Sequence, residues 1–108
     1  MRLKEKDVEV GYLYLTSANQ YRAVLAMKGE FMIYAPSLEG TAALNLNAPM
    51  PFENQPFKKC QIVTFAKKDY QDFDFNGSKA IKHKLDERQL AEVIAQCNAK
   101  SAIAALLA

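Results

Sequence analysis

Apolar and polar residues alternate along the first third of the chain with the period of β-strands. The alternation runs over residues 8–15 and 21–27, and side chains two positions apart share one face of a strand. The apolar segment 31–35 follows as a third strand and is ended by Pro36. The first of these segments has apolar residues on both faces toward its end. Turn-forming residues separate the segments at 16–20 and at Lys28–Gly29, where glycine accepts the positive φ of a tight hairpin. The pattern predicts a three-stranded antiparallel meander.

The stretch 36–57 lacks a regular period. Apolar residues at alternate positions of 41–46 indicate a short strand, whereas three prolines within 48–57 argue against a central strand there. A long loop of this kind either binds a ligand through Met50 and Phe52 or lies across the sheet and buries them. Burial is the interpretation that we favour.

The second half of the chain begins with two further strand signals. Residues 60–66 are rich in β-branched and aromatic types and predict a strand. Asn76–Gly77 is the strongest short-range hairpin signal in the chain. It predicts a hairpin with arms at 70–75 and 78–85.

A C-terminal helix is predicted over about 86–107, and its apolar face changes halfway along. Asp86, with Gln89 three residues later, forms the capping-box pattern of a helix start. The first half has one apolar stripe opposed by polar residues, whereas after Asn98 the polar side becomes apolar too. A helix that is apolar all round needs a neighbour on every side.

Two interpretations of this second half remain open. In the first, which we favour, it associates with a second copy of the chain or with another partner. In the second, residues 98–101 end one helix and start another, so that the last turns fold back on the same core. A membrane span is not expected, because no run of about 18 apolar residues occurs. The residues assigned to self-association are Ala99, Ala102, Ile103, Leu106 and Leu107.

Residues 8–35 are similar to the opening meander of SH3-like barrels. Small proteins of phages and integron gene cassettes begin in a comparable way. The resemblance implies a binding scaffold and no particular activity. The residues that carry it are Val10-Gly11-Tyr12-Leu13-Tyr14, Tyr21-Arg22-Ala23-Val24-Leu25 and Phe31-Met32-Ile33-Tyr34.

The order of elements predicts an α+β fold in a single domain over residues 1–108, with strands over about 8–85. The expected architecture is a strongly bent antiparallel sheet or a small SH3-like barrel of five or six strands, followed by the C-terminal helix. At 108 residues the chain is long enough to form a hydrophobic core.

The positive charge lies mainly in the second half of the chain. Five basic and six acidic residues in 1–57 give −1, and nine against six in 58–108 give +3. The hairpin over 67–84 is therefore a candidate nucleic-acid contact, in which lysines meet phosphates and a tyrosine stacks on a base. Interleaved aspartates oppose this interpretation, and we favour a solvated edge strand. The candidate contact residues are Lys67, Lys68, Tyr70, Lys79, Lys82 and Lys84.

No catalytic residues, metal site or cofactor are expected. Residues 72–77 begin like a calcium-binding loop, but the twelfth position of that loop is His83, a poor calcium ligand. His83 and Cys97 would be a base and a nucleophile. Cys97, however, falls on the apolar stripe of the helix, where a thiol acts as a small hydrophobe. An enzyme is therefore the weakest of the function classes.

The expected function is binding. We expect a small cytosolic binding or adaptor module of unknown partner that forms a homodimer through its C-terminal helix. The alternative is a nucleic-acid-binding accessory factor that uses the hairpin over 67–84. A cytoplasmic location is expected, because Cys60 and Cys97 resemble reduced thiols and the first residues contain no signal peptide.

Overall fold

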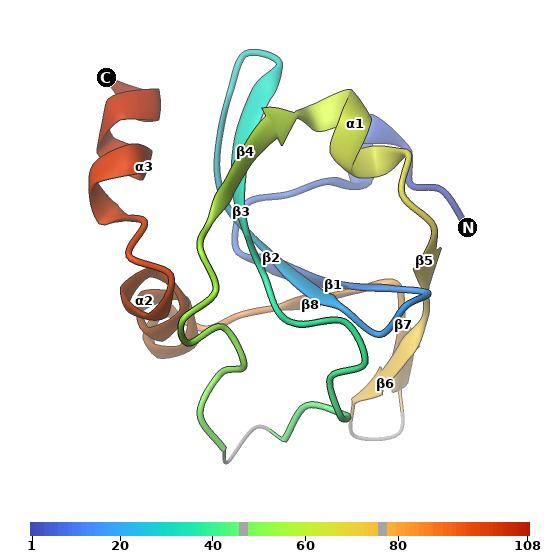
Figure 1. The fold of residues 1–108 in the computed structure, drawn as a ribbon. Helices are drawn as coiled ribbons and strands as arrows, with labels where there is room; N and C mark the ends of the chain where they lie inside the picture. Colours follow the sequence, from blue (N-terminus) through green and yellow to red (C-terminus); the bar gives the residue numbers. More distant parts are fainter. Residues whose placement is uncertain (46–47, 76–77) are drawn as a thin grey trace.

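An antiparallel meander lies at the centre of the protein (Figure 1). The structure is a computed structural model that describes residues 1–45, 48–75 and 78–108. In the main sheet β2 lies between β1 and β3, β4 follows β3, and both β5 and β8 pair with β1, while β6 and β7 form a separate hairpin. The strands are β1 (Tyr12–Thr16), β2 (Tyr21–Lys28), β3 (Phe31–Pro36), β4 (Lys58–Gln61), β5 (Tyr70–Gln71), β6 (Phe73–Phe75), β7 (Ser78–Ala80) and β8 (Lys82–Lys84).

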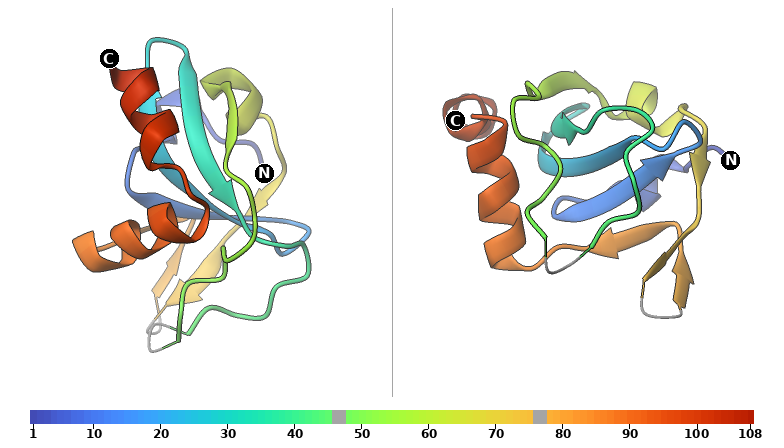
Figure 2. Two further views of the ribbon diagram at one scale, coloured as in Figure 1. Left: turned by 60° about the vertical axis from the view of Figure 1, so that its left-hand side comes forward. Right: turned by 60° about the horizontal axis from the view of Figure 1, so that its bottom comes forward.

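The predicted fold class is confirmed. The protein is α+β, with a six-stranded antiparallel sheet followed by helices at the C-terminal end. The sheet is strongly twisted in all views (Figures 1 and 2). Within the described residues it does not close, so the structure shows a bent open sheet and no barrel.

A β-bulge bends β2. Val24 pairs with Tyr34 and Ala26 pairs with Ile33, so Leu25 is an extra residue in this strand. An extra residue increases the local twist and bends the strand. Leu25 and Ala26, at this bulge, are both buried.

Both faces of the sheet are covered. Alternate residues of the strands point to opposite faces. The C-terminal helices and the segment 48–57 cover one face, and residues 3–8, which include the 3-10 turn Glu5–Asp7, cover the other together with α1 (Ile62–Ala66) (Figure 2). We call the first the helix-side core; it contains Leu13, Leu15, Tyr21, Ala23, Leu25, Ile33, Ala35, Met50, Phe52, Leu85, Val93, Cys97 and Ala99. We call the second the aromatic core; it contains Leu3, Val8, Tyr14, Val24, Met32, Tyr34, Ile62, Phe65, Ala66 and Tyr70.

The strand predicted over 60–66 is wrong from Ile62 onward. β4 ends at Gln61, and the helix α1 follows. The buried residues of α1 are Ile62, Phe65 and Ala66, spaced as one face of a helix. A strand would have turned Ile62 and Phe65 to opposite faces. The helical turn instead directs both into the aromatic core, and this burial overrides the local β-propensity.

The predicted C-terminal helix is two helices. α2 (Glu87–Gln96) and α3 (Lys100–Leu107) meet at an angle of 105°. Between them Asn98 has a φ of 55°, a left-handed conformation that asparagine adopts more readily than most residues. α3 returns to the sheet and packs on β2 (Figure 2). The structure therefore agrees with the second interpretation of this region, in which the last turns fold back on the same core.

The junction of α2 and α3 is a Schellman motif. Asn98 N donates to Ala95 O at 3.3 Å, and Ala99 N donates to Ile94 O at 3.1 Å. This pair of bonds satisfies carbonyls that have no partner within the helix. At the other end, the predicted capping box is present, because Gln89 N donates to the Asp86 side chain at 2.7 Å. Local signals therefore define both ends of α2.

The predicted hairpin is present, although its arms are interrupted. β6 and β7 pair in antiparallel register, and the turn at Asn76–Gly77 lies outside the described residues. The predicted arms 70–75 and 78–85 do not continue as two long strands. β5 and β8 instead leave the hairpin and pair with β1, which offers them an unoccupied edge.

Residues 41–45 form no strand, contrary to the expectation for 41–46; Leu46 lies outside the described residues. Leu44 N donates to the Tyr21 hydroxyl at 2.9 Å. A side chain thus accepts the hydrogen bond that a neighbouring strand would otherwise accept.

The left-handed residue at the helix junction provides a test of the fold. We expect Asn98→Gly to leave the free energy of unfolding within about 0.5 kcal/mol of wild type, because glycine has no Cβ penalty. Asn98→Val should lose about 1–2 kcal/mol, because a β-branched residue is strained at this φ. Urea denaturation followed by circular dichroism measures both. Equal stability of the valine and glycine variants would contradict the bent junction.

Candidate binding surfaces

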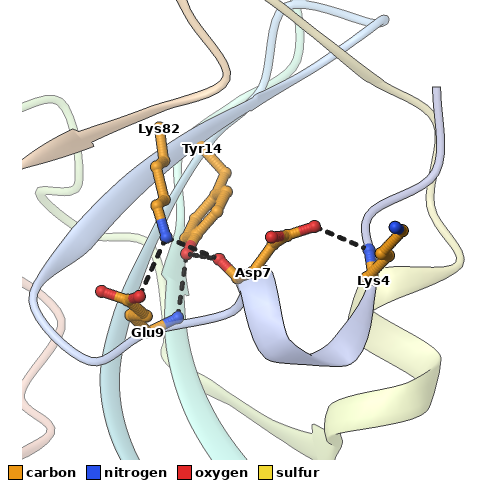
Figure 3. Close-up of polar contacts among 5 residues, drawn as sticks. All are labelled: Lys4, Asp7, Glu9, Tyr14 and Lys82. Carbon is orange, nitrogen blue, oxygen red and sulfur yellow. Dashed lines mark hydrogen bonds and ion pairs between the residues drawn. The ribbon is translucent and has the colours of Figure 1, made fainter.

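Lys82 is occupied within its own chain (Figure 3). Its Nζ lies 3.1 Å from Glu9 Oε1 and donates to Asp7 O at 3.3 Å. It also lies 4.9 Å from the centre of the Tyr12 ring. This lysine therefore holds β8 against the N-terminal segment, and its charge is partly compensated.

The Tyr14 hydroxyl joins the same network (Figure 3). It donates to Asp7 O at 2.7 Å and accepts from Glu9 N at 2.9 Å. The Asp7 carboxylate in turn accepts from Lys4 N at 3.1 Å. The tyrosine is fully buried, so these bonds fix the segment that covers the aromatic core.

Tyr70 is a correction to the predicted nucleic-acid contact. Its side chain is 1% exposed, and its hydroxyl donates to Phe65 O at 2.7 Å. Its ring lies edge-on to that of Tyr14, with 6.1 Å between the centres. Tyr70 therefore belongs to the aromatic core, and a nucleic-acid base cannot stack on its buried ring. The lysines of the predicted contact that remain exposed are Lys67, Lys68, Lys79 and Lys84.

The residues predicted for self-association mostly face their own domain. Ala99 is fully buried in the helix-side core, and Ala102, Ile103 and Leu106 are half-buried against it. Leu107 differs, since 54% of its surface is exposed. The fold-back of α3 therefore uses most of the apolar surface that the sequence analysis assigned to a partner.

The proline-rich segment is held against α2. Met50 and Phe52 are buried, as the favoured interpretation predicted. Met50 N donates to the Glu92 carboxylate, and Phe52 N donates to Gln96 Oε1 at 3.1 Å. Two residues of extended chain and four residues of helix both rise by about 6 Å, so the two donors match the two acceptors. The two acceptors, Glu92 and Gln96, were not identified from the sequence as partners of this segment, although their spacing of four residues was visible.

Arg22 is a residue that the sequence analysis missed. Its Cζ lies 4.9 Å from the centre of the Tyr34 ring and 5.7 Å from that of Phe65. Nε donates to Gln20 Oε1 at 2.7 Å, and Nη1 donates to the Tyr70 hydroxyl at 3.4 Å. In the sequence it was one polar position of an alternating strand, and no local pattern indicates the rings around it.

The candidate catalytic pair does not form a site. Cys97 lines a groove of about 410 Å³ together with Phe57, and its Sγ donates to Ile94 O at 3.8 Å. Burial raises the pKa of the Cys97 thiol, which leaves it a weak nucleophile. His83 lies on β8 opposite Leu13 and is not among the residues that line this groove.

The aspartates of the calcium-like motif border a second groove. Asp72 and Asp74 line about 300 Å³ together with Thr41 and Leu44. Across residues 1–45, 48–75 and 78–108, no group of three His, Cys, Asp or Glu side chains could hold a metal ion.

Comparisons with protein-family models, with curated proteins and with solved structures found no match to this chain. No single helix of the described chain is long and apolar enough to cross a membrane. α2 and α3 reach that length and composition only when taken together, and they are bent by 105° at their junction. The function must therefore be argued from the surfaces of the chain itself.

Alkaline pH tests the role of Tyr14. Burial raises the pKa of Tyr14 to about 12 from 10.0, so the unfolded chain ionises first as the pH rises. The contribution to stability is complete below about pH 10 and is lost between about pH 10 and about pH 12. Tyr14→Phe should be less stable at neutral pH by about 1–3 kcal/mol, because two backbone groups lose their partner. Its stability should then decline less steeply in the alkaline window.

Denaturant unfolding of both proteins from neutral pH to about pH 12 measures this difference. Curves that run parallel through the alkaline window would contradict the assigned role of the tyrosine.

The contact between Glu92 and the Met50 amide provides another test. Glu92→Ala should destabilise the fold by about 1–3 kcal/mol and accelerate hydrogen exchange at the Met50 amide, because a part-buried donor loses its acceptor. Glu92→Gln keeps an acceptor at this position and should restore most of both properties. If the glutamine and alanine variants behave alike, the hydrogen bond does not hold this segment.

Proposed function

We propose that the protein is a small binding module that associates with a second copy of itself, and that the contact is made by the outer flank of α3 together with Phe31. The observation that carries the proposal is the exposure of two large apolar side chains at one end of the molecule. Leu107 is 54% exposed and Phe31 is 41% exposed.

The contacts of Lys28 indicate that Phe31 and Leu107 lie close together. Lys28 lies opposite Phe31 in the register of β2 and β3. The Nζ of Lys28 also donates to Ala108 O, next to Leu107. The end of α3 lies beside the turn between β2 and β3 in the left view of Figure 2. Phe31, Leu107 and the half-buried Ile103 thus offer a partner one apolar surface, which we call the α3 surface.

The chemistry of α3 favours an antiparallel pairing with the same helix of a second copy. Ala104 and Ala105 are exposed, and small residues let two helices approach closely. Lys100, in the first turn, would lie near the last turn of the partner helix, where the carbonyls carry the negative end of the helix dipole. The pairing is then complementary in shape and in charge.

The size of the α3 surface supports a weak dimer. A helix of eight residues is about 12 Å long, so the contact buries less than the roughly 1,200 Å² of a standard stable interface. Dimers of this kind form and dissociate with concentration. Such reversibility suits an adaptor.

The remaining sequence-based expectations stay predictions. They comprise the resemblance of residues 8–35 to SH3-like proteins, a cytoplasmic location and a nucleic-acid contact through the hairpin. The nucleic-acid contact has less support than it had from the sequence alone, because Tyr70 is buried and Lys82 is paired with Glu9.

Sedimentation equilibrium from about 10 μM to about 1 mM tests the proposed dimer. We expect the average mass of wild type to rise over this range. Leu107→Asp should weaken association by about tenfold or more, because each copy would then place one carboxylate in the apolar contact. Leu107 is exposed, so the fold should keep its stability.

Leu38→Asp is the matched control, since Leu38 is 64% exposed and lies outside the α3 surface. Its association should equal that of wild type. A wild type that is monomeric throughout, or a control that weakens association as much as Leu107→Asp, would overturn the proposal.

A further inference from the structure

The Arg22 guanidinium has hydrogen-bond donors to spare. It uses one N–H for Gln20 and one for the Tyr70 hydroxyl, fewer than a guanidinium carries. Within the described part of the chain, no hydrogen bond or ion pair joins it to a carboxylate. The rings of Tyr34 and Phe65 hold it in place, so the cation is ordered before any ligand arrives.

The Tyr34 hydroxyl beside it is also unused. Tyr34 is 7% exposed, and its hydroxyl makes no hydrogen bond within the described residues. Every fully enclosed side-chain nitrogen or oxygen there has a partner, so this hydroxyl must reach the surface. Burial raises the pKa of Tyr34 although the Arg22 charge lowers it, and the hydroxyl therefore keeps its proton at neutral pH. It is a second spare donor at the same place.

Lys58 brings a second cation to the other side of Tyr34. It lies opposite Tyr34 in the register of β3 and β4. Cys60, two residues along the same strand, packs against the aromatic core, so Lys58 is on that face too. Lys58 is exposed, and no ion pair of the described residues involves it. Arg22 and Lys58 therefore extend from the two strands that flank Tyr34, on the same face of the sheet.

We propose that Arg22, Tyr34 and Lys58 form a binding site for a phosphate monoester. The guanidinium fork matches two oxygens of a phosphate, the tyrosine hydroxyl donates to a third, and the ammonium adds a point charge. Two cations without a carboxylate suit a dianion better than the single charge of a carboxylate or a phosphodiester. The site is on the aromatic-core face of the sheet, so it is independent of the α3 surface and of its test.

Arg22 also stabilises the aromatic core by its contacts with the rings, and a purely structural role would explain the same geometry. The two roles differ in their response to conservative changes. Tyr34→Phe removes a hydroxyl that has no hydrogen-bond partner among the described residues, so it should leave the stability unchanged and weaken phosphate binding. A structural role predicts no change in either property.

An NMR titration of the full chain with inorganic phosphate, at constant ionic strength, tests the site. We expect saturable shifts centred on Arg22, Tyr34 and Lys58, with a dissociation constant on the order of 1 mM. Methyl phosphate should bind similarly, whereas dimethyl phosphate and acetate should bind at least about tenfold more weakly, because each has one negative charge.

Three variants complete the test. Arg22→Lys keeps the cation over the rings but loses the fork, so it should fold and bind phosphate about tenfold more weakly. Tyr34→Phe should bind about fivefold more weakly, the usual effect of one hydrogen bond. Lys58→Ala should also weaken binding, whereas its matched control Lys59→Ala, on the opposite face of β4, should bind like wild type.

The proposal would be overturned by any of three results. The first is the absence of saturable binding to the wild type. The second is shifts spread evenly over the exposed lysines, which marks screening of surface charge. The third is equal affinity of the wild type, Arg22→Lys and Tyr34→Phe.

Discussion

The two-sided apolar character of the central strands is the constraint on which the rest of the structure depends. In β1 and β2 consecutive residues are buried, so both faces of the sheet must be covered. Neither the helices nor the loops are long enough to do this alone. The N-terminal segment and α1 cover one face, and the helices and the segment 48–57 cover the other. The return of α3 at Asn98 follows from the same demand, because a straight helix would leave part of β2 in water.

Elements that depend on residues close together in the sequence could be predicted from it. The alternation of β2, the apolar run of β3 and the capping box at Asp86 are local and were predicted. α1 was not, since only the aromatic core decides that Ile62 and Phe65 share a face. The binding surfaces were harder still. Leu107 was identified with its neighbours, but Arg22 depends on rings from three other segments, and a strand pattern contains no signal for that.

The two proposed contacts lie on opposite faces of one sheet. Lys58 and Lys59 show the division most directly, since successive residues of β4 point to opposite sides. Lys59 lies over Phe31 on the side of the α3 surface, and Lys58 lies opposite Tyr34 in the strand register, on the other face of the sheet. A single layer of β-sheet thus separates the proposed apolar contact from the proposed cationic one. We therefore expect a side-chain change in one proposed contact to leave the other intact, because no side chain belongs to both.

The segment between residues 48 and 57 illustrates how a loop without a strand partner can still have fixed positions. α2 accepts two backbone N–H groups, those of Met50 and Phe52; Pro49 precedes the first of these donors and Pro51 lies between the two. Proline has no N–H, so it is tolerated at positions 49 and 51, which donate no hydrogen bond to α2, and is excluded from positions 50 and 52. It also reduces the freedom of the unfolded chain. Descendants of this sequence can therefore change the side chains of the loop widely, as long as positions 50 and 52 stay apolar and never become proline.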